Sequence, residues 1–287
     1  MLLKSIGVAL LAGLLASRAS AGSVVALVPA IEVAPQPPAV EVALQVEVMR
    51  LRQAFEHEVL HPVRRDPVQD ARWITLARAE MASAGMAIER AQLVVVVDRN
   101  PRVQRLMILA AAADTAWQVI GGTQVSTGQT GRFDHYVTPR GAFHITDAIL
   151  GYRAEGTLNE NGIRGLGAKG MRVWDFGWQV AMKGWSEPAG KPDRTPIRLM
   201  LHATDPDKLE QRIGRPASQG CVRVPSTLNR FLDQHGVLDA VYERAAVTEI
   251  RFRALLLPGR SPSLLAGNTL VVVDSTEQPA VMAQTAH

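Results

Sequence analysis

Two short runs organise the sequence: His202-Ala203-Thr204, and Ser218-Gln219-Gly220-Cys221-Val222-Arg223. Cys221 is the only cysteine among the 287 residues, so it has no partner for an intramolecular disulfide. It follows a glycine, and His202 ends the apolar run Ile197–Leu201. A free thiol has a pKa of about 8.5, which a nearby imidazole can lower into the working range. We therefore predict a nucleophile at Cys221 and its base at His202. A buried structural cysteine and a histidine satisfied by the backbone are the alternatives.

The spacing of these residues resembles a known signature. His202, fifteen intervening residues, and then Ser218-x-Gly220-Cys221-Val222-Arg223 are similar to the motif of the L,D-transpeptidase catalytic domain, the YkuD-type fold. Two earlier pieces, Val125-Ser126-Thr127-Gly128 and Thr138-Pro139-x-Gly141-x-Phe143, resemble that family in the same order, so the resemblance spans about Gln92 to Asp274. Gln219 departs from the pattern, because the family usually has a second histidine there. Glutamine can donate a hydrogen bond but cannot titrate, which affects the expected rate more than the reaction class.

The resemblance implies an activity on peptidoglycan stem peptides. Cys221 would attack a tetrapeptide stem and form a thioester acyl-enzyme, which an amine of a second stem resolves into a cross-link. No metal or organic cofactor is expected. One alternative is an L,D-carboxypeptidase or other hydrolase that uses the same Cys/His site. Another is a non-catalytic wall-binding module in which Gln219 marks decay of the site.

Backbone groups around the nucleophile have expected roles. The resemblance implies that the carbonyl of Ala203 orients the ring of His202, and we do not assign this role to the nearby Asp205. Gly220 and Gln219 are expected to lend N–H groups to an oxyanion hole, and Ser218 to hold the loop by hydrogen bonds.

Further side chains are candidates for substrate contact. Arg223 either binds a substrate carboxylate or pairs with an internal acid. Tyr136 and Thr138 are expected to line the cleft. Three tryptophans either cap the edge of a sheet or wall the cleft over Cys221: Trp174, Trp178 and Trp185.

The N-terminus predicts export. Residues 1–21 are typical of a signal peptide, with Lys4 before an apolar core and Ala19-Ser20-Ala21 as the cleavage site; an uncleaved anchor is the alternative. Residues 22–40 contain a proline-rich linker. No later run is long and apolar enough to span a bilayer, so we expect a soluble protein of the periplasm or cell envelope. The net charge of +4 is scattered and does not indicate nucleic acid binding.

Periodicity predicts the elements of a mainly β, mixed α+β domain. Apolar spacings of three and four predict a helix from Leu44 to Val59, and Asp66–Ala84 predicts a second, so residues 41–90 are expected to form a helical hairpin. We expect a β-sandwich or barrel-like catalytic domain over residues 91–275, an insertion at about 240–266, and a disordered tail at 276–287. The predicted strands are Leu93–Val97, Arg105–Leu109, Trp117–Ile120, Thr123–Ser126, Pro196–Leu201 and Thr269–Val273.

His57-Glu58-Val59-Leu60-His61 has the H-E-x-x-H spacing of a helical zinc site, and Glu80 has a third-ligand spacing. We predict no metal here, because Pro62 ends the helix at the second histidine and no substrate-binding sheet precedes it.

Overall fold

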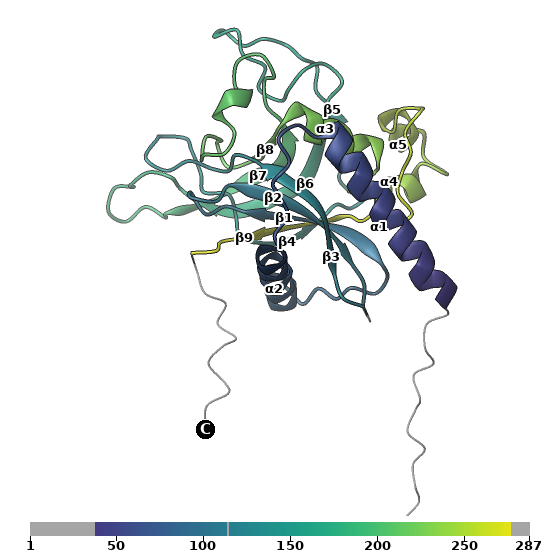
Figure 1. The fold of residues 1–287 in the computed structure, drawn as a ribbon. Coiled ribbons are helices and arrows are strands. Elements are labelled where there is room, and N and C mark those ends of the chain that lie inside the picture. The colour runs from purple at the N-terminus through teal and green to yellow at the C-terminus, as the bar shows by residue number, and fades with distance from the viewer. Residues whose placement is uncertain (1–37, 114, 277–287) are drawn as a thin grey trace, which may run out of the picture. The chain divides into compact units, whose positions relative to one another are not determined.

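The fold consists of two β-sheets and five α-helices in the part of the chain that the computed structural model describes, residues 38–113 and 115–276 (Figure 1). The predictions for residues 1–21, most of 22–40 and most of the tail lie outside those residues. The helices are α1 (Pro38–Glu58), α2 (Pro67–Ser83), α3 (Ser226–Gln234), α4 (Ala240–Ala245) and α5 (Ile250–Leu255). The strands are β1 (Gln92–Asp98), β2 (Arg105–Ala111), β3 (Gln118–Gln124), β4 (Gly141–His144), β5 (Tyr152–Arg153), β6 (Arg172–Met182), β7 (Arg194–Ala203), β8 (Val222–Val224) and β9 (Thr269–Val273).

The first sheet has the order β3-β2-β1-β9-β4, with β9 parallel to β1 and the other pairs antiparallel. Its strands are apolar at nearly every position because both faces are covered. Val94 and Val96 pack with α2 on one face, whereas Leu93, Val95 and Val97 join the main core on the other. This sheet is the structural centre of the domain.

The second sheet has the order β5-β6-β7-β8 and packs one face into the main core. Leu199 and Leu201 of β7 lie in that core with Trp174 of β6 and Val222 of β8. Two sheets packed face to face, with helices around them, confirm the predicted mixed α+β sandwich.

The N-terminal helices occur at the predicted positions. The buried apolar residues of α1 are those of the apolar period. Asp66 caps α2 by accepting from the N–H groups of Val68 and Gln69 at 2.8 and 3.2 Å. The helices do not pack as a hairpin, however. α1 contributes Val48, Leu51 and Phe55 to the main core, as does Val59 just after it, whereas α2 packs Trp73, Ala77 and Met81 on the opposite face of the first sheet.

A single strand, β3, replaces the two predicted strands Trp117–Ile120 and Thr123–Ser126. The predicted strands leave out Gly121 and Gly122, but the backbone of these two residues is part of the strand. A Cβ on Gly121 would lie 2.3 Å from the ring of Phe55, and one on Gly122 would lie 2.0 Å from the Sδ of Met107. These glycines therefore make room for side chains that pack on the sheet.

The predicted insertion at 240–266 contains α4 and α5 and belongs to the main core, to which it contributes Tyr242, Phe252, Leu255 and Leu265. Buried charges just before it attach this region to β6. Asp239 accepts from Arg172 at 2.7 Å and from the indole N–H of Trp174 at 3.0 Å. Trp174 is therefore a core residue, neither an edge cap nor a cleft wall.

The H-E-x-x-H spacing does not produce two histidines on one helical face. α1 ends at Glu58, and His61 lies beyond it with a φ of 54°. Glu80 pairs with Arg140 at 2.6 Å. In residues 38–113 and 115–276, no group of three or more His, Cys, Asp or Glu side chains is arranged to hold a metal ion. No helix in that same part of the chain has the length and apolar content needed to cross a bilayer.

Candidate active site

The face of the second sheet that turns away from the core carries the candidate site. In register across the strands, Tyr152 lies opposite Val173, Val173 opposite His202, and His202 beside Arg223. Alternate residues of a strand share a face, so Cys221 lies on this face too, next to Met200. The fold thus brings Cys221 and His202 to neighbouring strands on one surface.

Cys221 is partly buried against the edge of β7. Its Sγ lies 3.6 Å from the carbonyl oxygen of Arg198, to which the thiol donates. Burial raises the pKa of the thiol, and the backbone N–H of Met200 and the charge of Arg223 offset this only partly. The sequence-based expectation of a lowered pKa is therefore not met, because the low-dielectric surroundings outweigh the nearby cation.

His202 is buried, and its Nδ1 lies 2.7 Å from the carbonyl oxygen of Ala203. That carbonyl can only accept, so Nδ1 carries the proton and Nε2 is left to act as a base. Burial lowers the pKa of His202 to about 4, with a smaller contribution from Arg223. The imidazole is thus neutral near pH 7. Asp205 is bonded to three backbone N–H groups, those of Arg164, Asp207 and Lys208.

In the resting structure, Cys221 and His202 are not bonded to each other. Among the described residues, neither side chain has a hydrogen bond to the other. A neutral base and an un-ionised thiol on the same face make proton transfer at the moment of attack the chemically reasonable course.

Two buried hydroxyls fix the loop that carries Cys221. Thr138 donates to the carbonyl of Gly220 at 2.8 Å and accepts from the N–H of Gly128 at 2.8 Å. Ser218 donates to the carbonyl of Cys221 at 2.6 Å. Because the C=O and N–H of a trans peptide point in opposite directions, the bond from Thr138 also sets the direction of the N–H of Cys221.

Gly220 has a φ of 122°, which an L side chain rarely adopts, and a Cβ there would lie 2.7 Å from the Cδ1 of Ile197. The N–H of Gly220 donates to the hydroxyl of Ser218 at 3.1 Å. Within the described residues, no acceptor is found for the N–H groups of Gln219 and Cys221. These two amides are thus the ones available to an oxyanion.

One comparison with known proteins shows the family. The model of the L,D-transpeptidase catalytic domain, YkuD, matches residues 92–242, just over half of the chain. The chain belongs to the L,D-transpeptidase catalytic-domain family. No functionally curated protein matches the sequence.

One solved structure that the chain resembles is the crystal structure of a fused Zn-dependent amidase/peptidase/peptidoglycan-binding domain-containing protein from Clostridium acetobutylicum. The identity is 13%, and the match covers 75% of this chain but only 65% of that one, with a TM-score of 0.28. A likeness this weak supports no inference about the site.

Of the remaining residues suggested by the L,D-transpeptidase signature, Arg223 has the clearest surroundings. It donates to the carbonyl of Ala217 at 3.1 Å, and its buried Nε has no partner. No carboxylate among the described residues pairs with it, so the internal acid that was one of the two predictions is not found there. Gln219 is exposed.

Tyr136 and Thr138 differ in position. Tyr136 is half-buried beside Gly220, and its ring meets that of Trp185 edge-on, with centroids 5.3 Å apart. Thr138 is fully buried and supports the loop from within, so it does not line the cleft as predicted. Trp178 is 66% exposed on the face that carries Cys221.

Sequence reasoning does not single out three side chains that surround the thiol. Asp175 on β6 binds Arg198 on β7, with 2.9 and 3.0 Å between Nε and the carboxylate oxygens. The hydroxyl of Tyr152 lies 3.3 Å from the Sδ of Met200. The pair of Asp175 and Arg198 could have been suspected from the sequence, because each is a charged residue within an apolar strand. Tyr152, in a glycine-rich stretch, had none.

Proposed function

We propose that the protein is a peptidoglycan L,D-transpeptidase that works through a thioester on Cys221. One observation carries the proposal. In a chain of this family, the only cysteine lies on the same sheet face as a histidine whose Nε2 is left to act as a base. The fixed loop and the two amides without acceptors support it further.

In the proposed first half-reaction, Sγ of Cys221 attacks the amide carbonyl at the L-centre of the third residue of a tetrapeptide stem. Nε2 of His202 accepts the thiol proton, and the N–H groups of Gln219 and Cys221 stabilise the oxyanion. The C–N bond then breaks, and the imidazolium gives its proton to the departing amine of D-alanine. A thioester and a neutral imidazole remain.

In the second half-reaction, the amine of another stem attacks the thioester carbon. The C–S bond breaks, and the thiol of Cys221 regains its proton through His202. The product is a cross-link between third residues. If water attacks instead, the same site acts as an L,D-carboxypeptidase, or releases a wall-linked protein.

The products decide between these reactions. Purified protein is incubated with tetrapeptide muropeptides, and the products are weighed by mass spectrometry. Dimers support transfer, whereas tripeptide alone contradicts it and supports hydrolysis.

A carbapenem tests the nucleophile and the non-catalytic alternative. We expect a mass adduct on the wild type and none on Cys221→Ser. No adduct on the wild type would count against catalysis and would fit a wall-binding module with a decayed site. An adduct that persists in Cys221→Ser would refute the assignment of the nucleophile.

We also propose that the protein acts in the periplasm or cell envelope, from the composition of residues 1–21. Fractionation of cells that produce the full chain tests this. Recovery of the protein only with the cytosol would contradict it.

A further inference from the structure

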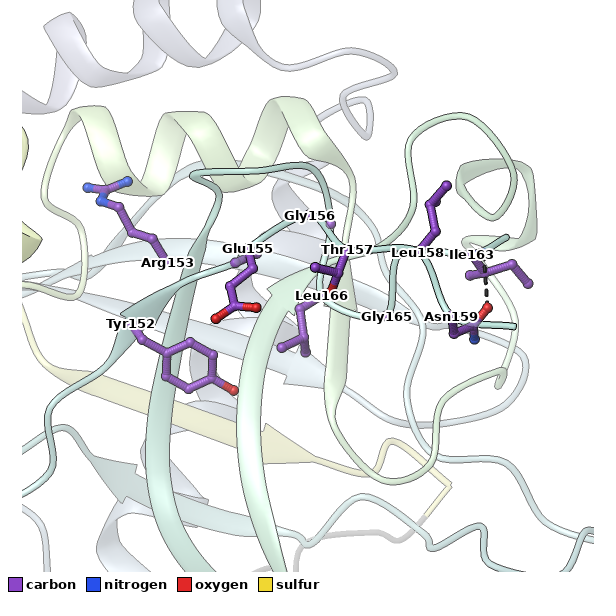
Figure 2. Close-up of a pocket in the computed structure, with 12 residues that line it drawn as sticks. Tyr152, Arg153, Glu155, Gly156, Thr157, Leu158, Asn159, Ile163, Gly165 and Leu166 are labelled. Atoms are coloured by element: carbon purple, nitrogen blue, oxygen red, sulfur yellow. Dashed lines mark hydrogen bonds between the residues drawn. The ribbon is translucent and has the colours of Figure 1, made fainter. Parts of the chain in front are cut away.

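A cavity of about 480 Å³ adjoins the candidate site (Figure 2). Residues from one chain segment, 152–167, line it. In Figure 2, Tyr152, Glu155 and Leu166 lie towards one end, and Leu158, Asn159 and Ile163 towards the other. The volume falls within the range of about 300–1,000 Å³ that is usual for small-ligand sites.

The cavity borders the surroundings of both proposed catalytic residues. The hydroxyl of Tyr152 contacts Met200, and Met200 lies on β7 next to Cys221. Gly167 lies against Ala203, whose carbonyl holds the ring of His202; a Cβ on Gly167 would be 2.7 Å from that of Ala203.

Two of the residues that line the cavity are charged, Arg153 and Glu155. Arg153 is neutralised by Asp233, at 2.8 and 3.1 Å, and also donates to the carbonyl of Leu255. Glu155 is exposed, and among the described residues no ion pair or hydrogen bond involves its carboxylate. An unpaired carboxylate in a concave site attracts a cation, and a primary ammonium is the cation that a carboxylate binds with short, charge-assisted hydrogen bonds.

Charges of opposite sign flank His202. The register places Tyr152 and its cavity on one side of His202 and Arg223 on the other. Arg223 lacks a carboxylate partner in the described residues, as Glu155 lacks a cation. An anionic group of one substrate and a cationic group of the other would therefore be drawn to opposite sides of the base.

We infer that the cavity lined by Tyr152 and Glu155 binds the acceptor substrate, a primary amine, with Glu155 holding its ammonium group. This rests on the proposed transpeptidase function. The bound ammonium releases one proton to solvent through Glu155, and the neutral amine attacks the thioester carbon. His202 takes the second proton and returns it to Sγ as the C–S bond breaks, so that an amide and the free thiol result.

The test separates donor from acceptor. A tetrapeptide stem serves as donor, and an N-acetylated tripeptide stem with a side-chain amine, which lacks the leaving D-alanine, serves only as acceptor. Dimer and tripeptide are quantified against acceptor concentration for the full-length wild type, Glu155→Gln, Glu155→Asp and the control Glu160→Gln. Glu160 is an exposed acid of the same segment that does not line the cavity.

We expect Glu155→Gln to raise the apparent KM for the acceptor by tenfold or more, since a hydrogen bond to a charged group contributes about 1.5–3 kcal/mol. A larger share of the thioester should then be hydrolysed by water to the tripeptide. Glu155→Asp should recover part of the affinity, Glu160→Gln should match the wild type, and carbapenem adduct formation should be the same in all four proteins.

An unchanged acceptor KM in Glu155→Gln, or an equal rise in Glu160→Gln, would overturn the inference. A wild type that forms the carbapenem adduct but yields only tripeptide at every acceptor concentration would instead contradict the proposed transfer reaction, on which the inference rests. If the wild type forms no adduct at all, the proposed function itself fails, and the two failures are thereby distinguished.

Discussion

The two sheets of this protein are covered in different ways. The first sheet is buried on both faces, by α2 on one side and the main core on the other. The second sheet buries one face and presents the other, which becomes exposed along the outer half of β6 and β7, where Trp178 and Val180 lie. Every candidate side chain for catalysis lies on that second face or in a loop beside it. The difference indicates that the first sheet is the buried scaffold of the domain and that the second sheet carries the candidate active site.

The largest expected effect concerns His202, at the buried end of the second sheet's outer face. His202→Ala removes the proposed base, and general base catalysis contributes about 10²–10⁴-fold to rate. The rate of carbapenem acylation should fall by that factor, with a folded far-UV circular dichroism spectrum. A rate within twofold of the wild type would show that another group accepts the thiol proton.

The next effect is on stability and separates the two sheets directly. Ile108→Ala empties a fully buried position of the first sheet, and such truncations cost about 2–5 kcal/mol of unfolding free energy. Val180→Ala, at a position 64% exposed on the second sheet, should change it by less than about 0.5 kcal/mol. Urea denaturation measures both variants. Equal losses would mean that the outer face of the second sheet is covered in solution.

A smaller effect is expected for Thr138, whose hydroxyl holds the carbonyl of Gly220. Thr138→Val keeps the shape but leaves buried polar groups without a partner, which costs about 1–3 kcal/mol. It also frees the peptide before Cys221 to rotate, so acylation should slow about tenfold because a misplaced catalytic group loses rate steeply. Thr138→Ser, which keeps the hydroxyl, should restore acylation. Equal slowing in Thr138→Ser would contradict the prediction, because the hydroxyl alone would then not account for the rate.

The smallest effect is on pH dependence. Since burial lowers the pKa of His202 to about 4 and raises that of Cys221, the neutral base and the thiol both persist across mild pH. Acylation should then change by less than about twofold between pH 5.5 and 7.5, whereas an ordinary histidine pKa of about 6.5 would give about tenfold. The folded protein should also lose stability as pH falls from about 6.5 towards 4, because there the unfolded chain binds a proton that the folded chain does not. An acid limb centred near pH 6.5 would contradict this assignment.

Much of the fold could be predicted because the helices and strands concerned follow from local sequence patterns. The helix with three-and-four apolar spacing, the helix predicted over Asp66–Ala84 and the apolar strands β1 and β9 are all found close to their predicted positions. Elements whose local pattern is overruled by contacts distant in sequence could not be predicted. Gly121 and Gly122 belong to a strand because Phe55 and Met107 need their space.

The same limit applies to the site. Cys221 and His202 follow from residue type, order and spacing. The ion pair of Asp175 with Arg198 depends on the register of β6 and β7 and on the irregularity between Asp175 and Trp178, which no local pattern reveals. The burial of Thr138 could not be predicted either, because it depends on a hydrogen-bond partner 82 residues away. The sequence therefore predicts, wrongly, that Thr138 lines the cleft.

The position of β9 has a consequence for the order of events in synthesis. β9 lies between β1 and β4 in the first sheet and pairs with β1 in parallel, although it is the last strand in the described part of the chain. A nascent chain that ends before Thr269 has no strand to join β4 to the other three. The first sheet is therefore completed only once residues 269–273 have been made, and contacts so distant in sequence form slowly.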